Sequence, residues 1–253
     1  MTEELPFVRA GSGPAFVLVH GYLGGSAQWQ DQLHAFAPGH DVITPDLPGF
    51  GAAAALPGPD SIGSFAEAVL GCLDGLGIGR FALMGHSMGG MIVQEMAARA
   101  GDRVEKLVLY GTGPLGRMPD RFEPLETSME RLATEGVAAT ADRICATWFV
   151  KGNDATGYAL ARDLGRRANP QAARNALVAM RDWDGRAALA KLRMPCRIVW
   201  GDQDRSYRWP QVEALWRGIP DASLAVVPEA SHAVHLEKPA LFNAMIRDFL
   251  LPD

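Results

Sequence analysis

This chain has few cysteines, and its basic residues are fewer than its acidic residues. Its 253 residues include three cysteines, Cys72, Cys145 and Cys196, and no C-x-x-C pair. Cysteines this far apart indicate no disulfide framework or zinc site, and they suit a reducing compartment. Lys and Arg number 24 against 29 Asp and Glu, for a formal net charge of -5. Proteins that bind a phosphate backbone present a basic face, so this balance argues against a nucleic-acid partner.

Long hydrophobic runs are scarce as well. The longest apolar stretches are the length of a strand, well short of the roughly 20 residues of a membrane-spanning helix. The first residues, MTEELPFVRAGSGPAFVLVHG, lack the basic start and apolar run of a signal peptide. We therefore expect a cytoplasmic protein with no membrane partner. The histidines show no H-E-x-x-H or paired-ligand spacing, so we expect no bound metal.

The chain does contain a regular alternation of short apolar runs and helical patterns. The runs are FVLVHG, DVITPD, RFALMGH, VEKLVLYG, CRIVWGD and SLAVVP, and LPFVR is a candidate for one more strand at the start. Strands that are apolar throughout are buried on both faces, as in a parallel sheet. Helical patterns cover residues 29–37, 61–76, 88–100, 209–217 and 239–251. The alternation predicts an α/β fold with a mostly parallel central sheet and helices on both faces.

This alternation is interrupted once. Residues 115–191 are mainly helical without a convincing buried strand, and the strand pattern resumes at MPCRIVWGD. We interpret residues 1–114 and 192–253 as one core domain, and residues 115–191 as a helical cap, or lid, inserted into it. Ligands of open α/β sheets bind at the carboxyl ends of the strands, so a cap at that edge would enclose a pocket.

The motif GHSMG places Ser87 between Gly85 and Gly89, after an apolar strand and before an amphipathic helix. A turn this tight imposes strained backbone angles on its central residue, and flanking glycines relieve the clashes. The serine hydroxyl then stands exposed at the edge of the sheet, beside a helix N-terminus that favours developing negative charge. The motif therefore predicts a nucleophile at Ser87.

A serine nucleophile needs a base, and the base needs an orienting acid. GDQD follows a strand and offers Asp202 and Asp204, whereas SHAVH follows the last strand and offers His232 and His235. Loops at the carboxyl ends of the strands would carry these groups to the edge that holds Ser87. The residues themselves leave both acids and both histidines as candidates.

Five motifs in this order resemble those of the α/β-hydrolase superfamily. They are HGYLGG (20–25), PDLPGFG (45–51), GHSMGG (85–90), GDQD (201–204) and SHAVHLEKP (231–239). The resemblance covers nearly the whole chain and implies the α/β-hydrolase fold. It also implies Ser87 as nucleophile, His232 as base and Asp204 as acid, since the family's usual G-x-x-D and G-H-x-x-H-L-E-x-P patterns select these positions. Ser231 stands where the family usually has glycine.

The same resemblance implies an oxyanion hole, and it bears on the number of strands in the sheet. Two main-chain N–H groups would hold the oxyanion, that of Met88 after the nucleophile and that of Tyr22 after the HG pair. His235 and His86 then have packing and hydrogen-bonding roles. Many family members begin with a two-strand hairpin, whereas only LPFVR precedes the HG strand here. We therefore expect about seven to eight strands.

One further motif suggests a cofactor. GTGPLG (111–116) fits the G-x-G-x-x-G pattern of dinucleotide sites and follows a strand. A dinucleotide fingerprint opens a continuous helix and is followed by an acidic residue at the next strand, whereas Pro119 and Pro124 interrupt this region. We therefore expect no nucleotide and no other cofactor.

The predicted cap holds candidates for substrate contact. Among its aromatic residues we single out Trp148 and Trp183 as candidate substrate-binding residues, although such residues more often pack helices together. Four arginines of the segment could bind a substrate carboxylate, although such residues more often form a solvated helix face. They are Arg117, Arg121, Arg166 and Arg167.

We predict a cofactor-free serine hydrolase that cleaves a small carboxylic ester or lactone through an acyl-enzyme. SMGGMIVQ is similar to the elbow region of bacterial esterases and enol-lactonases. One alternative is a carbon–carbon bond hydrolase of aromatic ring-cleavage products, although those enzymes usually have tryptophan where Ala233 follows His232, and Gly-Pro-Gly after their HG pair. Another is a small-molecule receptor on the same fold. We expect a small-molecule substrate as the partner, and a monomer or homodimer.

Overall fold

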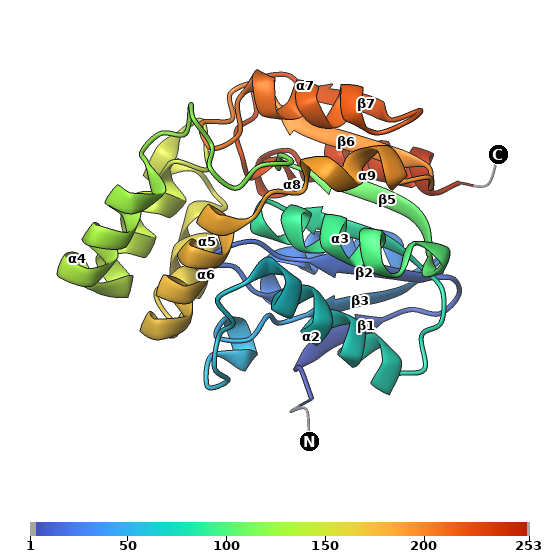
Figure 1. Ribbon diagram of the computed structural model, residues 1–253, viewed down its shortest axis with the longest axis horizontal. Helices are drawn as coiled ribbons and strands as arrows, with labels where there is room; N and C mark the ends of the chain where they lie inside the picture. Colours follow the sequence, from blue (N-terminus) through green and yellow to red (C-terminus); the bar gives the residue numbers. More distant parts are fainter. Residues whose placement is uncertain (1–3, 252–253) are drawn as a thin grey trace.

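The computed structural model describes residues 4–251 and arranges them around one seven-stranded sheet (Figure 1). Its strands are β1 (Phe7–Ala10), β2 (Ala15–Val19), β3 (Asp41–Pro45), β4 (Phe81–His86), β5 (Val104–Tyr110), β6 (Cys196–Gly201) and β7 (Ser223–Val227). Their order across the sheet is β1-β3-β2-β4-β5-β6-β7. β1 pairs antiparallel with β3, and each other pair of neighbours is parallel. The predicted fold class is confirmed, and LPFVR contributes the edge strand β1.

Helices cover both faces of this sheet. They are α1 (Gln30–Phe36), α2 (Ile62–Gly75), α3 (Met88–Arg99), α7 (Trp209–Gly218) and α9 (Pro239–Leu250). One apolar cluster packs Phe65 of α2, Met91 of α3 and Leu215 of α7 against the sheet, and a second packs Leu33 of α1 and Phe242 of α9. All residues of β2, β3 and β4 are buried, as their apolar sequences require. Within residues 4–251 no helix combines the length and apolarity needed to cross a membrane.

The ends of these helices follow local sequence signals. The hydroxyl of Ser61 accepts the N–H of Ser64 over 3.1 Å and caps α2. The helix expected over 29–37 differs from its prediction, because a 3-10 turn, Ser26–Trp29, precedes α1. The carboxylate of Asp46 accepts the N–H of Ser26 over 2.7 Å. A neighbouring loop thus supplies the cap of this turn, which a local reading of the sequence does not show.

The chain between β5 and β6 forms a separate group of helices at one end of the sheet (Figure 1). They are α4 (Leu125–Ala146), α5 (Tyr158–Gly165) and α6 (Pro170–Asp182), and α4 is interrupted at Gly136, where φ is 80°. An isolated β-bridge joins Leu115 to Asp184, and the N–H of Gly116 donates to the carbonyl of Trp183 over 3.1 Å. These contacts hold the two ends of the segment together, beside the carboxyl end of β5.

Candidate active site

The turn between β4 and α3 holds Ser87 at φ 59° and ψ -121°. Residues other than glycine rarely adopt this conformation, and it carries strain. A Cβ atom added at Gly85 would lie 2.3 Å from the carbonyl oxygen of Gly89, and one added at Gly89 would lie 2.3 Å from a main-chain oxygen of β2. The Ser87 N–H donates to the carbonyl of Tyr110 over 3.0 Å, and the Thr112 hydroxyl donates to the Ser87 carbonyl over 2.9 Å. Close backbone packing and β5 together hold the strained turn.

Asp204 and His232 meet at the same edge of the sheet. Nδ1 of His232 lies 2.9 Å from Oδ2 of Asp204, and both side chains are buried. The other carboxylate oxygen accepts the N–H groups of Ser206 at 2.7 Å and Tyr207 at 3.1 Å. Because an ionised carboxylate only accepts hydrogen bonds, Nδ1 carries the proton and Nε2 keeps its lone pair. The structure thus brings Asp204, and not Asp202, to His232.

Two further histidines pack around His232. Nε2 of His86 lies 3.1 Å from the main-chain carbonyl of His232, which also accepts the Tyr110 hydroxyl over 2.9 Å. Nδ1 of His235 lies 3.0 Å from the same hydroxyl. Burial lowers the pKa of His86 well below its usual value and that of His235 to about 3, and the positive charge of a protonated His232 acts in the same direction. Both rings are therefore neutral at ordinary pH, with packing and hydrogen-bonding contacts.

The loop that carries His20 and Gly21, called the HG loop, lies directly against Ser87. A Cβ atom added at Gly21 would lie 2.8 Å from Cβ of Ser87. Nε2 of the neighbouring His20 accepts the N–H of Leu47 over 2.9 Å, so its Nδ1 carries the proton and donates to the Gly21 carbonyl over 2.8 Å. These bonds connect the HG loop to the loop after β3, and they explain why the HGYLGG and PDLPGFG motifs occur together.

The two expected oxyanion donors belong to residues beside Ser87. Met88 is the first residue of α3, and the first N–H groups of a helix have no partner within it. Tyr22 directly follows Gly21, and it lines the same cavity as Ser87. Both residues are thus neighbours of Ser87, and their role as oxyanion donors stays a prediction.

A small cavity of about 20 Å³ lies in front of Ser87, which is room for about one water molecule. Its lining residues are Tyr22, Ser87, Met118, Arg121, Ile144, Trp148, Met180, Ser206, Tyr207 and His232. Trp148 is thus at the cavity, and its ring centre lies 6.0 Å from that of His232. The structure does not bring Trp183 there. That side chain follows α6 and borders a different hollow, with its Nε1 3.4 Å from Glu95.

Several cavity residues were not singled out from the sequence. Tyr207 stacks on His232, with ring centres 5.7 Å apart and an angle of 17° between the rings. Its position three residues after Asp204, in the turn that this acid caps, is a local signal that could have identified it. Arg121 appeared only as one of four arginines. Met118 and Met180 come from distant parts of the chain, so no local pattern points to them.

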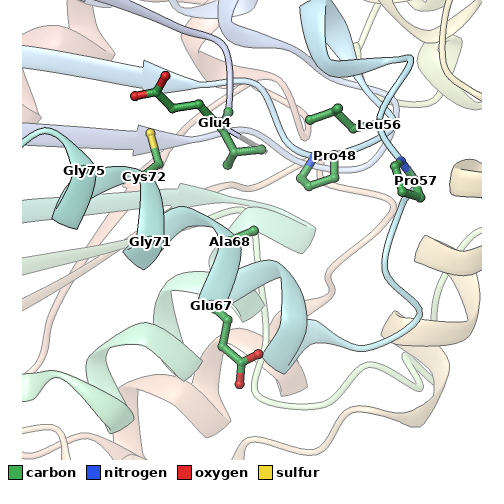
Figure 2. A pocket seen from close by; sticks show the side chains of 10 residues that line it. Glu4, Pro48, Leu56, Pro57, Glu67, Ala68, Gly71, Cys72 and Gly75 are labelled. Atoms are coloured by element: carbon green, nitrogen blue, oxygen red, sulfur yellow. The ribbon is translucent and has the colours of Figure 1, made fainter. Parts of the chain in front are cut away.

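A larger cavity of about 470 Å³ lies elsewhere, beside α2 (Figure 2). Its lining residues are Glu4, Leu5, Pro48, Leu56, Pro57, Glu67, Ala68, Gly71, Cys72 and Gly75. Its titratable groups are two carboxylates and the Cys72 thiol, whose pKa is raised by burial. This cavity holds no pairing of a nucleophile with a base. In the part of the chain that the structure describes, no three His, Cys, Asp or Glu side chains are placed to hold a metal ion.

Known proteins share this arrangement. The family described as alpha/beta hydrolase fold matches residues 14–239. A 2-hydroxy-6-oxo-6-phenylhexa-2,4-dienoate hydrolase of Comamonas testosteroni is 30% identical over 96% of this chain and 89% of its own. A putative carbamate hydrolase of Pseudomonas savastanoi is 28% identical over 99% of this chain and 98% of its own. The enol-lactonase of Burkholderia xenovorans has a TM-score of 0.89 and 26% identity, covering 97% of this chain and 96% of that one.

A thermophilic esterase from Thermogutta terrifontis is also similar, with a TM-score of 0.88 and 27% identity over 97% of this chain and 92% of that one. The names of these proteins all describe hydrolases, which supports hydrolase activity in this chain. The family match covers the six strands β2 to β7, the turn at Ser87 and the loops that carry Asp204 and His232. This chain belongs to the alpha/beta hydrolase fold family.

Proposed function

We propose that the protein is a cofactor-free serine hydrolase in which Ser87, His232 and Asp204 act as a catalytic triad and residues 115–191 act as the cap over it. The observation that carries this proposal is the 2.9 Å bond between Nδ1 of His232 and Asp204, on a cavity that Ser87 and His232 both line. That bond orients the imidazole and leaves Nε2 as the base, the form in which it activates a serine.

In the first half of the reaction, Oγ of Ser87 attacks the substrate carbonyl carbon and its proton passes to Nε2 of His232. The carbonyl electron pair moves onto oxygen, where the N–H groups of Tyr22 and Met88 stabilise the charge. Asp204 stabilises the imidazolium that forms. The tetrahedral intermediate then expels the alkoxide, which takes the proton from His232, and an acyl-enzyme remains.

In the second half, water gives a proton to Nε2 of His232 and attacks the acyl carbon. The new tetrahedral intermediate expels Oγ of Ser87, which recovers the proton from His232 and releases the carboxylic acid. A lactone follows the same steps, except that the leaving alcohol stays attached to the product. Ser87, His232 and Tyr22 line the cavity, whereas Asp204 and Met88 lie behind His232 and Ser87, and the proposed steps need no cofactor.

A small ester or lactone is the substrate class we favour. The enol-lactonase and the esterase described above support it, at 26% and 27% identity over nearly the whole chain.

Hydrolysis of a carbon–carbon bond is the second candidate. Two relatives that are 29% and 30% identical to this chain are named 2-hydroxy-6-oxo-6-phenylhexa-2,4-dienoate hydrolases. Against this candidate, Ala233 follows the expected base, where enzymes of that group usually have tryptophan.

The experiment compares wild type with Ser87→Ala and, as a matched control, with the exposed Ser64→Ala. Turnover of short and medium-chain p-nitrophenyl esters and of a 2-hydroxy-6-oxohexa-2,4-dienoate is followed by absorbance. We expect ester turnover in wild type and Ser64→Ala and none in Ser87→Ala. Turnover of the dienoate alone would support the second candidate. If wild type turns over neither the esters nor the dienoate but binds one of them tightly, a receptor function would replace both hydrolase candidates.

A further inference from the structure

The cavity at Ser87 contains one permanently charged side chain, that of Arg121. Nη1 of Arg121 donates to the carbonyl of Glu123 over 2.8 Å and to the hydroxyl of Ser128 over 2.9 Å. The guanidinium carbon lies 4.1 Å from the ring centre of Phe122. These contacts hold the guanidinium at the cavity, where an arginine with no such contacts would extend into solvent.

Arg121 makes no direct ion pair in the described part of the chain, although the Ser128 hydroxyl links it to the carboxylate of Glu123. Glu123 is the nearest acid along the chain, but its two carboxylate oxygens each lie 2.7 Å from Nη1 of Arg143. Among residues 4–251, no carboxylate oxygen lies within 4.0 Å of the Arg121 guanidinium. Burial lowers the pKa of Arg121, as expected for a cation held away from water. The cavity is therefore lined by a guanidinium that has no carboxylate in direct contact, with Glu123 acting on it only from a distance.

Two buried hydroxyl groups lie close to this charge. Tyr22 and Tyr207 line the cavity, and neither hydroxyl makes a hydrogen bond of ordinary geometry in the described part of the chain. The Tyr207 hydroxyl lies near the side chains of Ser87 and Thr112. Burial raises the pKa of both phenols. The charge of Arg121 lowers the pKa of Tyr22, and hydrogen bonding with Ser87 followed by the charge of Arg121 lowers that of Tyr207, but burial has the larger effect on each. Both hydroxyls therefore keep their protons at neutral pH and are available as donors. Buried donors without a partner cost free energy, which a bound acceptor would recover.

We propose that Arg121 and the hydroxyl groups of Tyr22 and Tyr207 form a subsite for a carboxylate on the acyl part of the substrate. The guanidinium supplies the charge and the two phenols supply further hydrogen bonds, a donor set that suits a carboxylate. The substrates would be half-esters or lactones of short dicarboxylic acids. This inference rests on the proposed function, since the acyl group must lie between the subsite and Ser87.

Two methionines allow such a substrate to enter. Met118 and Met180 line the same cavity. Methionine side chains are unbranched and flexible, so they can repack at low cost when an acyl group occupies the space. The small volume of the cavity is therefore compatible with a substrate larger than water.

The kinetic test uses two esters of equal chain length, monomethyl glutarate and methyl valerate, which differ by one carboxylate. Hydrolysis is followed by titration at constant pH, and the readout is the ratio of the two kcat/KM values. Wild type is expected to prefer monomethyl glutarate, and Arg121→Met to lower that preference by about 10- to 100-fold. Tyr22→Phe and Tyr207→Phe should each lower it by a smaller factor. Arg117→Met, which removes an exposed arginine of the same loop, should leave it unchanged.

A wild-type ratio near one, or a preference that survives Arg121→Met, would overturn the proposal. Arg121→Lys serves as a second variant. It keeps the positive charge but loses the planar guanidinium that can bind a carboxylate through two hydrogen bonds, so its preference for monomethyl glutarate should be intermediate. Thermal denaturation of each variant checks that it is folded.

A binding test separates this proposal from the proposed function. Ser87→Ala protein is titrated calorimetrically with monomethyl glutarate and with methyl valerate. We expect the anionic ester to bind at least about 10-fold more tightly, and Arg121→Met in the same background to remove the difference. Selective binding without turnover by wild type would retain the subsite and reject the hydrolase. Ester turnover with equal binding would retain the hydrolase and reject the subsite.

Discussion

The Nε2–H group of His86 donates to the main-chain carbonyl of His232 over 3.1 Å, and the two imidazole rings lie 4.5 Å apart, centre to centre. A carbonyl oxygen only accepts, so the proton of His86 must be on Nε2. Nδ1 of His86 has no partner in residues 4–251, in agreement with a neutral ring. The residue before the nucleophile thus fixes the backbone of the expected base, and it does so in its uncharged form.

Stability should therefore fall in mild acid. Burial lowers the pKa of His20, His86 and His235 from the usual 6.5, to about 3 for His235. The unfolded chain then binds protons that the folded chain does not, so this stability is full above pH 6.5 and is lost as the pH falls toward the lowered values. Each histidine contributes about 1.4 kcal/mol per pH unit within that window.

Urea unfolding between pH 7.5 and 5 measures this dependence. The slope of the free energy of unfolding against pH reports how many more protons the unfolded chain binds than the folded chain. His235→Asn should lower that number by about one, and His34→Asn, at an exposed position, serves as its control. A free energy of unfolding that stays constant over this range would contradict the assignment of neutral buried rings.

Replacement of Ser87 should separate catalysis from strain. Ser87→Ala and Ser87→Gly both remove the nucleophile and should lower kcat by at least about 10⁴-fold. Only glycine tolerates φ 59° and ψ -121° without strain, so Ser87→Gly should be more stable than Ser87→Ala by about 1–3 kcal/mol. Urea unfolding of the two variants provides the comparison. Equal stabilities would show that the turn stores no strain.

Asp204→Asn should impair the reaction without loss of the fold. The amide has nearly the size of the carboxylate, but it cannot hold His232 as the Nδ1–H tautomer with the same preference. We expect kcat at neutral pH to fall by about 10⁴-fold. Asp202→Asn is the matched control and should stay within a few-fold of wild type. Similar losses of kcat in both variants would show that the 2.9 Å contact between His232 and Asp204 is not needed for catalysis.

Gly21→Ala should displace the nucleophile. The added methyl group would lie 2.8 Å from Cβ of Ser87, so one of the two must move. Because shifts of about 1 Å in reacting groups can cost about 100-fold, we expect a loss of kcat/KM of at least 10-fold. Gly71→Ala is the control, since α2 leaves open space there and alanine should stabilise the helix by about 0.5–1 kcal/mol. Full activity of Gly21→Ala would contradict the close contact.

Much of the site could be predicted because its chemistry is tied to local geometry. The turn at Ser87 needs glycines at fixed offsets, and loops after parallel strands must meet at one edge of the sheet. Asp204 and His232 lie on two such loops, so their order along the chain already limited the choice. The helix boundaries follow for similar reasons, since caps and prolines are local signals.

The remaining features depend on contacts between distant segments. Trp183 and Trp148 are both tryptophans of the same helical segment, yet only Trp148 reaches the cavity. Which of the two reaches the cavity depends on how α4 and α6 pack onto the core. The spacing of apolar residues along the sequence does not predict that packing. Arg121 could not be distinguished from three other arginines for a similar reason. Its contacts with Phe122, Glu123 and Ser128 are close in sequence, but the cavity that it lines is formed by residues from distant parts of the chain.

The bridge between Leu115 and Asp184 has a consequence for how this protein can change over generations. β5 and β6 are adjacent, so the chain that leaves one strand returns to its immediate neighbour, and the bridge joins the two ends of the excursion. A stretch whose ends already touch can be lengthened, shortened or exchanged without altering the order of the strands. Replacement of this single stretch would therefore change what surrounds Ser87, while the strands and the contact between Asp204 and His232 are kept.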